Sequence, residues 1–264
     1  LPQIERIAYL SELAGVQLAD IEHLILVDAK APVSFFAYPG KKSYLVPDTC
    51  AVHTLVSPAQ NARSTLENLA HILGADTCQA NLQAAGRPSR PRGKLSAEKV
   101  CKAVGHLLPK DAILIDESIT SGLMLGVMTA GAPRHDLITV TGGAIGQGLP
   151  NAVGAAIACP NRPVLALIGD GSAMYTIQAL WTMAREKLNI TSIIFNNASY
   201  SVLNMELQRV GAEQAGPKAK AQLDLTGPVL NFSQLAQGMG VHSVRTDNTE
   251  EFVKALEFAI ANPG

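Results

Sequence analysis

The feature that most constrains the fold of this chain is a regular alternation of short apolar runs with helical patterns, which starts near residue 96. The runs are bounded by polar residues, as expected of strands buried on both faces. Strands that alternate with helices are typical of a parallel sheet covered by helices, so this region is predicted to have an α/β fold. The predicted strands are 112–116, 137–141, 164–168 and 192–195, with a further one near 241–245.

Amphipathic segments separate these runs and predict the covering helices. Ser96 can cap the first helix, in which Val100, Cys101 and Val104 share an apolar face. Asn248 and Glu251 can form a capping box at the start of the last helix. The remaining predicted helices are 119–130, 148–158, 232–238 and 249–262, and one more whose buried stripe is Ile177, Leu180, Trp181, Ala184 and Leu188.

The part of the chain before residue 84 has a weaker pattern. Residues 24–28 (LILVD) predict one buried strand, and residues 61–73 predict an amphipathic helix. The stretch AAGRPSRPRGKLS, which covers the predicted linker 84–95, is rich in Pro, Gly and Arg. This composition is typical of a solvated linker, and a basic binding patch is the alternative.

Charge and cysteine usage exclude several classes of protein. The formal net charge is −1 with both signs dispersed, which argues against a nucleic-acid surface or a polybasic membrane patch. No apolar run approaches the roughly 20 residues that span a bilayer. The four cysteines form no C-x-x-C pair, which argues against a zinc site and favours reduced thiols in a cytoplasmic protein. The chain starts without Met and stops after a predicted helix, so we interpret it as a fragment of a longer polypeptide.

The most informative motif is Gly169-Asp170-Gly171-Ser172, which directly follows the strand at 164–168. Ligands of parallel sheets bind at the carboxyl ends of strands, and glycines let the backbone approach a phosphate closely. An aspartate there would repel a bare phosphate unless a cation lies between them. Mg²⁺ is the natural cation, because it binds hard oxygens and shares its coordination shell with phosphate.

A second oxygen donor is expected from the neighbouring strand end, Asn196-Asn197. Between Gly171 and Asn196 lie 24 residues, which suits one helix and one parallel strand. Asp170, the Asn197 side chain and the Ser199 carbonyl can therefore share one metal ion. Each motif alone is also an ordinary turn, and only the combination with this spacing is specific.

The segment GDGSAMYTIQALWTMAREKLNITSIIFNNASYSVL resembles the thiamine-diphosphate-dependent enzymes, in particular the acetolactate synthase and benzoylformate decarboxylase branch. The resemblance covers residues 96–264, the diphosphate-binding domain of that fold. It extends more loosely to residues 1–83, which look like part of the family's Rossmann-like middle domain. The family implies Mg²⁺ and thiamine diphosphate as cofactors. FAD is possible through the middle domain, but nothing here supports it.

The resemblance also implies roles for individual residues. Thr120 and Ser121 of DESITSG would contact the diphosphate, although they could simply cap the following helix. In TGGAIGQGLP, the Gly143 carbonyl would accept from the cofactor's aminopyrimidine, and Ile145 would support its bend. The implied metal ligands are Asp170, Asn197 and Ser199, and the implied cofactor-binding residues are Thr120, Ser121, Gly143, Ala144, Ile145, Gly169, Asp170, Gly171, Ser172, Asn197, Ser199 and Tyr200.

The implied function is decarboxylation or carboligation of 2-oxo acids, with acetolactate synthase as the leading model and benzoylformate decarboxylase as the alternative. Leu203, Asn204 and Leu207 follow the site but do not identify the substrate. The glutamate that activates the cofactor in this family is expected in a separate domain, so no catalytic residue is assigned here and the fragment alone is expected to be inactive. That domain would also form the homodimer or homotetramer.

Two other classes remain as alternatives. A non-catalytic module could retain the diphosphate anchor and bind the cofactor without turnover. A nicotinamide-dinucleotide domain is disfavoured, because no G-x-G-x-x-G follows the first strand with an acidic residue about 20 positions later.

Overall fold

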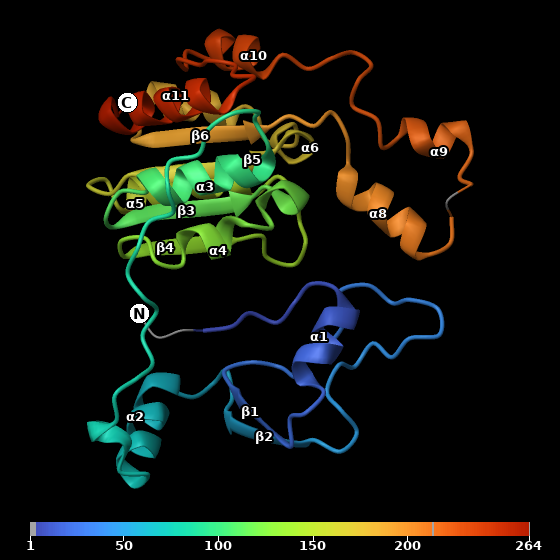
Figure 1. Ribbon diagram of the computed structural model, residues 1–264, viewed down its shortest axis with the longest axis vertical. Helices are drawn as coiled ribbons and strands as arrows, with labels where there is room; N and C mark the ends of the chain where they lie inside the picture. The colour runs from blue at the N-terminus through green and yellow to red at the C-terminus, as the bar shows by residue number, and fades with distance from the viewer. Residues whose placement is uncertain (1–3, 213, 264) are drawn as a thin grey trace. The chain divides into compact units, whose positions relative to one another are not determined.

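The computed structural model describes residues 4–212 and 214–263. The chain divides into two compact units, Leu1–Leu82 and Gln83–Gly264, and each is considered by itself (Figure 1). None of the helices in the described residues is both long and apolar enough to cross a membrane.

The first unit is small and holds a two-stranded parallel sheet, β1 (His23–Val27) with β2 (Ala51–Val56). The strand predicted at 24–28 is therefore confirmed, whereas β2 was not expected. The predicted helix 61–73 is confirmed as α2 (Ala62–Ile72), and the Asn61 side chain caps it by accepting from the Ser64 N–H at 3.0 Å. The unit also contains α1 (Ser11–Leu18) and the 3₁₀ turn η1 (Ala75–Thr77).

The second unit is built on a four-stranded parallel sheet in the order β4-β3-β5-β6. The strands are β3 (Ala112–Glu117), β4 (His135–Thr139), β5 (Val164–Gly169) and β6 (Ile190–Phe195). The helices are α3 (Ala97–Leu107), α4 (Leu125–Thr129), α5 (Gly148–Ala158), α6 (Asp170–Ala173), α7 (Ala179–Arg185), α8 (Ser201–Arg209), α9 (Pro217–Ala221), α10 (Phe232–Gly238) and α11 (Thr249–Ala261), with the 3₁₀ turn η2 (Ile119–Gly122). The predicted α/β fold is confirmed.

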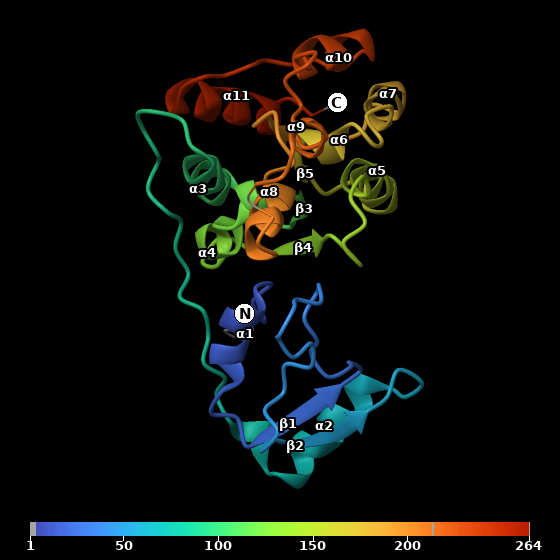
Figure 2. The ribbon, with the colours of Figure 1, turned by 90° about the vertical axis from the view of Figure 1, so that its right-hand side faces the viewer.

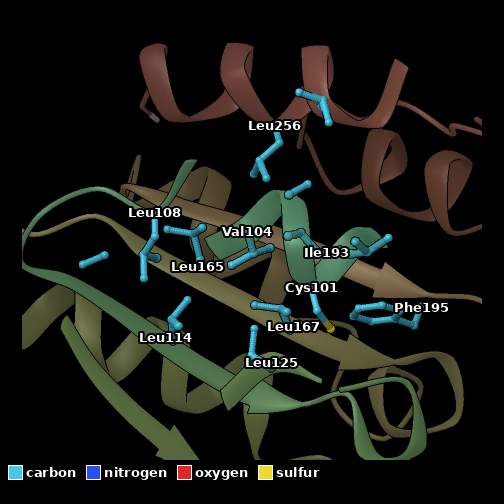
Figure 3. Close-up of a cluster of buried hydrophobic side chains, with 14 residues drawn as sticks. Cys101, Val104, Leu108, Leu114, Leu125, Leu165, Leu167, Ile193, Phe195 and Leu256 are labelled. Carbon is cyan, nitrogen blue, oxygen red and sulfur yellow. The ribbon is translucent and has the colours of Figure 1, made fainter. Parts of the chain in front are cut away.

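Helices cover both faces of this sheet, because strand side chains alternate between two hydrophobic clusters (Figure 2). Leu114, Leu165 and Leu167 face one cluster, which α3, α4 and α11 complete (Figure 3). Ile115 and Ile168 face the other cluster, to which α5, α7 and α10 contribute. The fully buried β5 explains its uninterrupted apolar run.

Two predicted helix caps are present. The Ser96 hydroxyl accepts from the Lys99 N–H at 3.3 Å, and the Asn248 side chain accepts from the Glu251 N–H at 2.9 Å. The segment 84–95 has no helix or strand, but it is tied to this unit. The Arg87 guanidinium donates to the carbonyls of His106 and Leu108, both at 2.7 Å, and so satisfies the carboxyl end of α3.

Some predicted elements differ from the structure. The helix predicted at 119–130 is divided into η2 and α4, with Leu123 and Met124 between them, and its first residue, Ile119, takes a left-handed φ of 51°. The strand 137–141 begins two residues earlier, at His135, and no strand is present at 241–245. Trp181, predicted on a buried stripe, is 53% exposed and packs beside the Arg185 guanidinium instead.

Candidate functional site

Strand register places the predicted site residues at one edge of the sheet. Gly169 of β5 pairs with Phe195 of β6, and Ile168 pairs with Glu117 of β3. The three strands therefore end at the same level, and the segments 118–121, 170–172 and 196–200 emerge beside one another. Figure 1 shows the arrowheads of β3 and β6 directed toward the side where α6 and α8 lie.

Asp170 links the ends of β5 and β6. Its side chain is buried at 3% exposure, and Oδ1 accepts from the Gly171 N–H at 2.8 Å. Oδ2 accepts from the Ala198 N–H at 2.5 Å, across to the loop after β6. Ala198 has a left-handed φ of 55°, which directs its N–H to the carboxylate. The carboxylate is therefore fixed before any ligand arrives.

Asn197 and Ser199 lie in that same loop; neighbours in sequence hold Asn197, and Leu223 and Asn204 hold Ser199. The Asn197 Oδ1 accepts from the Ser199 N–H at 3.0 Å, and its Nδ2 donates to the Ser201 hydroxyl at 3.0 Å. The Ser199 hydroxyl donates to the Leu223 carbonyl at 3.2 Å and accepts from Asn204 at 2.9 Å. The Asn197 side chain is exposed, in contrast to Asp170.

Tyr200 explains the second glycine of the motif. A Cβ on Gly171 would lie 2.3 Å from the Cε1 atom of the Tyr200 ring, so only glycine lets the ring pack there. Burial raises the pKa of the Tyr200 hydroxyl, with a further contribution from the neighbouring Tyr175. The raised pKa favours the protonated hydroxyl. The Tyr200 side chain also lines the site.

The loop before α5 contains the predicted residues Gly143, Ala144 and Ile145. Gly142, Gly143 and Gly146 have φ values of 64°, 66° and 96°, a conformation that favours glycine. The Thr176 hydroxyl donates to the Gly146 carbonyl at 2.6 Å from the other side. Within the loop, the Gln147 side chain donates to the carbonyls of Thr141 at 3.0 Å and Ala144 at 2.7 Å.

Sequence reasoning missed Glu117, the last residue of β3. Its side chain is 1% exposed and accepts from the N–H groups of Gly146 at 2.6 Å, Gln147 at 3.3 Å and Gly148 at 2.8 Å. Burial raises the pKa of this carboxyl, while the three N–H donors act against that shift. An acidic residue in the buried run AILIDE was the signal that could have identified it.

A small cavity of about 50 Å³ lies where these segments meet. Among the predicted cofactor-binding residues, Gly143 and Ala144 do not line it. The cavity is lined by Thr120, Ser121, Ile145, Gly169, Asp170, Gly171, Ser172, Asn197, Ser199 and Tyr200, together with Ser118, Ile119, Ser201 and Val202. This volume suits an ion and part of a phosphate rather than a whole cofactor.

A larger hollow of about 480 Å³ runs along β6 and the segments 230–233 and 241–247. It shares Ser121 and Asn197 with the small cavity but does not include Asp170. Because the buried carboxylate and the glycines surround the small cavity, we consider the small cavity the candidate site.

The donor set at the small cavity fits a magnesium–diphosphate group. Asp170 supplies a carboxylate, Asn197 an amide oxygen and Ser199 a carbonyl, which are the hard oxygens that Mg²⁺ prefers. Thr120, Ser121 and Ser172 supply hydroxyls suited to phosphate oxygens, whereas the Ser118 hydroxyl donates to Asp116. Within the described residues there is no cluster of three or more His, Cys, Asp and Glu side chains that could hold a metal.

Comparisons with known proteins point to one family. The model described as thiamine pyrophosphate enzyme, C-terminal TPP binding domain, matches residues 121–264; thiamine pyrophosphate is another name for thiamine diphosphate. A Mycobacterium tuberculosis protein named "Putative acetolactate synthase large subunit IlvX" is 51% identical over 100% of this chain and 51% of its own length. A Pseudomonas aeruginosa benzoylformate decarboxylase is 30% identical over 94% of this chain and 48% of its own length.

Among solved structures, a thiamine diphosphate-dependent 4-hydroxybenzoylformate decarboxylase of Rhodococcus jostii RHA1 superposes with a TM-score of 0.77. It is 26% identical, and the match covers 97% of this chain and 50% of that one. The chain therefore spans about half the length of the relatives that it matches.

Proposed function

The chain belongs to the thiamine pyrophosphate enzymes, and from that premise we propose that it provides the Mg²⁺ and diphosphate anchor of an enzyme acting on 2-oxo acids. One observation carries the proposal: ten of the residues that the family motifs implicate line a single cavity around the buried carboxylate of Asp170. Those residues come from four separate segments of the chain, at 120–121, 145, 169–172 and 197–200. A chance turn at Gly169–Ser172 would not bring the other three segments to it.

We assign the residues of the cavity as follows. Asp170, the Asn197 side-chain oxygen and the Ser199 carbonyl hold Mg²⁺. The hydroxyls of Ser172, Thr120 and Ser121 bind the diphosphate, with Gly169, Gly171 and Tyr200 forming the walls. Gly143, Ala144 and Ile145 support the part of the cofactor beyond the diphosphate, with the Gly143 carbonyl as an acceptor and Ile145 as an apolar support.

The bound cofactor supplies the reactive carbon and the electron sink for cleaving or joining bonds next to a carbonyl. The contribution of this chain is to bind and orient it. We assign no catalytic residue to the chain. The activating carboxylate that the family requires is proposed to come from a separate domain, which also provides the homo-oligomeric contact.

Acetolactate synthase-like chemistry is the proposed reaction, because the relative with 51% identity carries that name. Benzoylformate decarboxylase-like chemistry is the alternative, supported by the relative with 30% identity and by the superposed structure. Comparing turnover of pyruvate and benzoylformate separates the two proposed reactions, with the proposed longer polypeptide that contains this chain, here called the parent enzyme, as the catalyst. The four free cysteines suit a reducing compartment, so a cytoplasmic location is proposed as well.

The direct test is calorimetric titration of thiamine diphosphate into the 264-residue chain, first with Mg²⁺ and then with EDTA. The proposal expects binding with Mg²⁺ and none with EDTA. Equal binding in both buffers would contradict the assignment of a metal ion to the site. No binding in either buffer would contradict the proposal that this chain anchors the diphosphate. Binding by a parent enzyme that turns over neither substrate would favour a non-catalytic module.

A further inference from the structure

We propose that Glu117 is a positioning residue that holds the loop Gly142–Gly148 in its binding conformation. This inference rests on the proposed function, because that loop carries the residues assigned to the cofactor beyond its diphosphate. Glu117 is not among the residues that line the cavity, so it acts through the loop rather than by touching a ligand.

The geometry of the carboxylate supports this role. Oε1 accepts from Gly146 and Gln147, and Oε2 accepts from Gly148, so both oxygens serve consecutive backbone N–H groups. These N–H groups lie at the N-terminus of α5, and the N-cap residue of this helix, Gln147, makes no side-chain capping hydrogen bond. A buried carboxylate with three such donors is strongly held, and its removal leaves buried donors without partners.

The Gln147 side chain also donates to the carbonyls of Thr141 at 3.0 Å and Ala144 at 2.7 Å, but among the described residues only Glu117 accepts from the N–H groups of Gly146, Gln147 and Gly148. Three of its glycines have positive φ values, and glycine adopts many conformations when it is not restrained. Close packing at Gly148 shows how tightly the carboxylate seats: a Cβ there would lie 2.6 Å from Oε2 and 2.4 Å from the Ile168 side chain. The Thr176 hydroxyl is a second tether, on the Gly146 carbonyl.

Glu117 also connects two parts of the site. The next residues in the chain, Ser118–Ser121, line the cavity on the diphosphate side. Its carboxylate meanwhile fixes the loop Gly142–Gly148, which contains Ile145. One buried side chain therefore sets the position of the cofactor-bend loop relative to the diphosphate-binding segments.

The experiment compares the variants Glu117→Gln and Glu250→Gln. The Glu250 carboxylate also accepts a backbone N–H, from Gly93 at 2.8 Å, but on the exposed start of α11, so it controls for the loss of a charged acceptor. Hydrogen exchange is measured at the amides of Gly146, Gln147 and Gly148 without cofactor, and thiamine diphosphate is then titrated with Mg²⁺. Glu117→Gln is expected to speed exchange at these amides and to weaken cofactor affinity, each by about tenfold or more.

If Glu117→Gln does not fold, Glu117→Asp replaces it, because the shorter side chain keeps the charge but cannot reach all three amides. It is expected to give intermediate exchange and affinity. Unchanged protection of the three amides, or cofactor affinity equal to that of Glu250→Gln, would overturn the positioning role. If the unsubstituted chain itself fails to bind cofactor, the proposed function fails, and the exchange measurement alone decides whether Glu117 holds the loop.

Discussion

The ends of β5 and β6 lie side by side, yet they are built in different ways. After β5, Asp170 and Ser172 are 3% and 4% exposed and belong to the packed interior. After β6, Asn197 is exposed and is held by hydrogen bonds to Ser199 and Ser201 of its own loop. One half of the candidate site is thus fixed by the buried core, and the other half by hydrogen bonds within its own loop and to residues 223–225.

This contrast indicates that the position of the loop after β6 depends on the buried segment after β5. The hydrogen bond from the Ala198 N–H to Asp170 Oδ2 ties the exposed loop to the buried carboxylate. Removing the partner of a buried polar group costs more free energy than removing the partner of an exposed one. Substitutions after β5 are therefore expected to weaken cofactor binding and stability more than substitutions after β6. The following substitutions test that order.

The largest effect is expected for Asp170→Ala. It removes the only carboxylate assigned to Mg²⁺, so affinity for thiamine diphosphate in Mg²⁺ buffer should fall by about 100-fold or more. The lost hydrogen bonds to Gly171 and Ala198 should lower the free energy of unfolding by about 1–3 kcal/mol. Calorimetry and urea unfolding measure the two effects.

The matched control for Asp170→Ala is Asp247→Ala, which removes an exposed carboxylate paired with Arg245. It should leave cofactor affinity unchanged. Normal Mg²⁺-dependent binding by Asp170→Ala would show that the metal assignment is wrong.

Gly171→Ala is expected to have the next largest effect. The added Cβ would collide with the Tyr200 ring, and overpacking of this kind costs about 1–3 kcal/mol of unfolding free energy. Urea unfolding of Gly171→Ala, Tyr200→Ala and the double variant measures the coupling between the two positions. The double variant should lose less than the sum of the single ones; simple additivity would mean that the ring does not restrict residue 171.

Asn197→Ala should weaken cofactor binding by about tenfold, less than Asp170→Ala, because a neutral amide oxygen is a weaker partner than a carboxylate. The same calorimetric titration measures it, with Asn196→Ala as the control from the same strand end. An effect equal to that of Asp170→Ala would remove the proposed contrast between the two halves.

Ser199→Ala is expected to have the smallest effect on binding, within about threefold, since only its carbonyl is assigned to the metal. The substitution loses the hydroxyl contacts to Leu223 and Asn204, which concern the loop rather than the ligand. A loss comparable to that of Asn197→Ala would indicate that the hydroxyl itself takes part.

Much of this fold could be predicted because buried strands and capped helices leave clear local signals. β5 appears as an uninterrupted apolar run, and the Ser96, Asn61 and Asn248 caps mark where helices start. β2 was missed because most of its residues are exposed and it lacks an apolar face. The left-handed φ of Ile119 at the start of η2 could not be predicted, since such a φ on a β-branched residue depends on its surroundings.

The candidate site also contains residues that could be predicted from the sequence and one that could not. Asp170 and Asn197 carry motif and spacing, so their common position was predictable once a parallel sheet was expected. Glu117 was not, because its importance depends on contacts with Gly146 and Gly148, about 30 residues further along the chain. A sequence read in local windows does not reveal such partners.

The pairing of Gly169 with Phe195 has a consequence for variation in chain length. The positions of Asp170 and Asn197 are set by the ladder between β5 and β6, not by the connection that joins them. Lengthening the turn near Lys187 adds only a slowly growing loop-closure entropy. Adding one residue within β6 instead moves every following side chain of the strand to the opposite face. Length changes between the two motifs should therefore be tolerated in the connection and excluded from the strand.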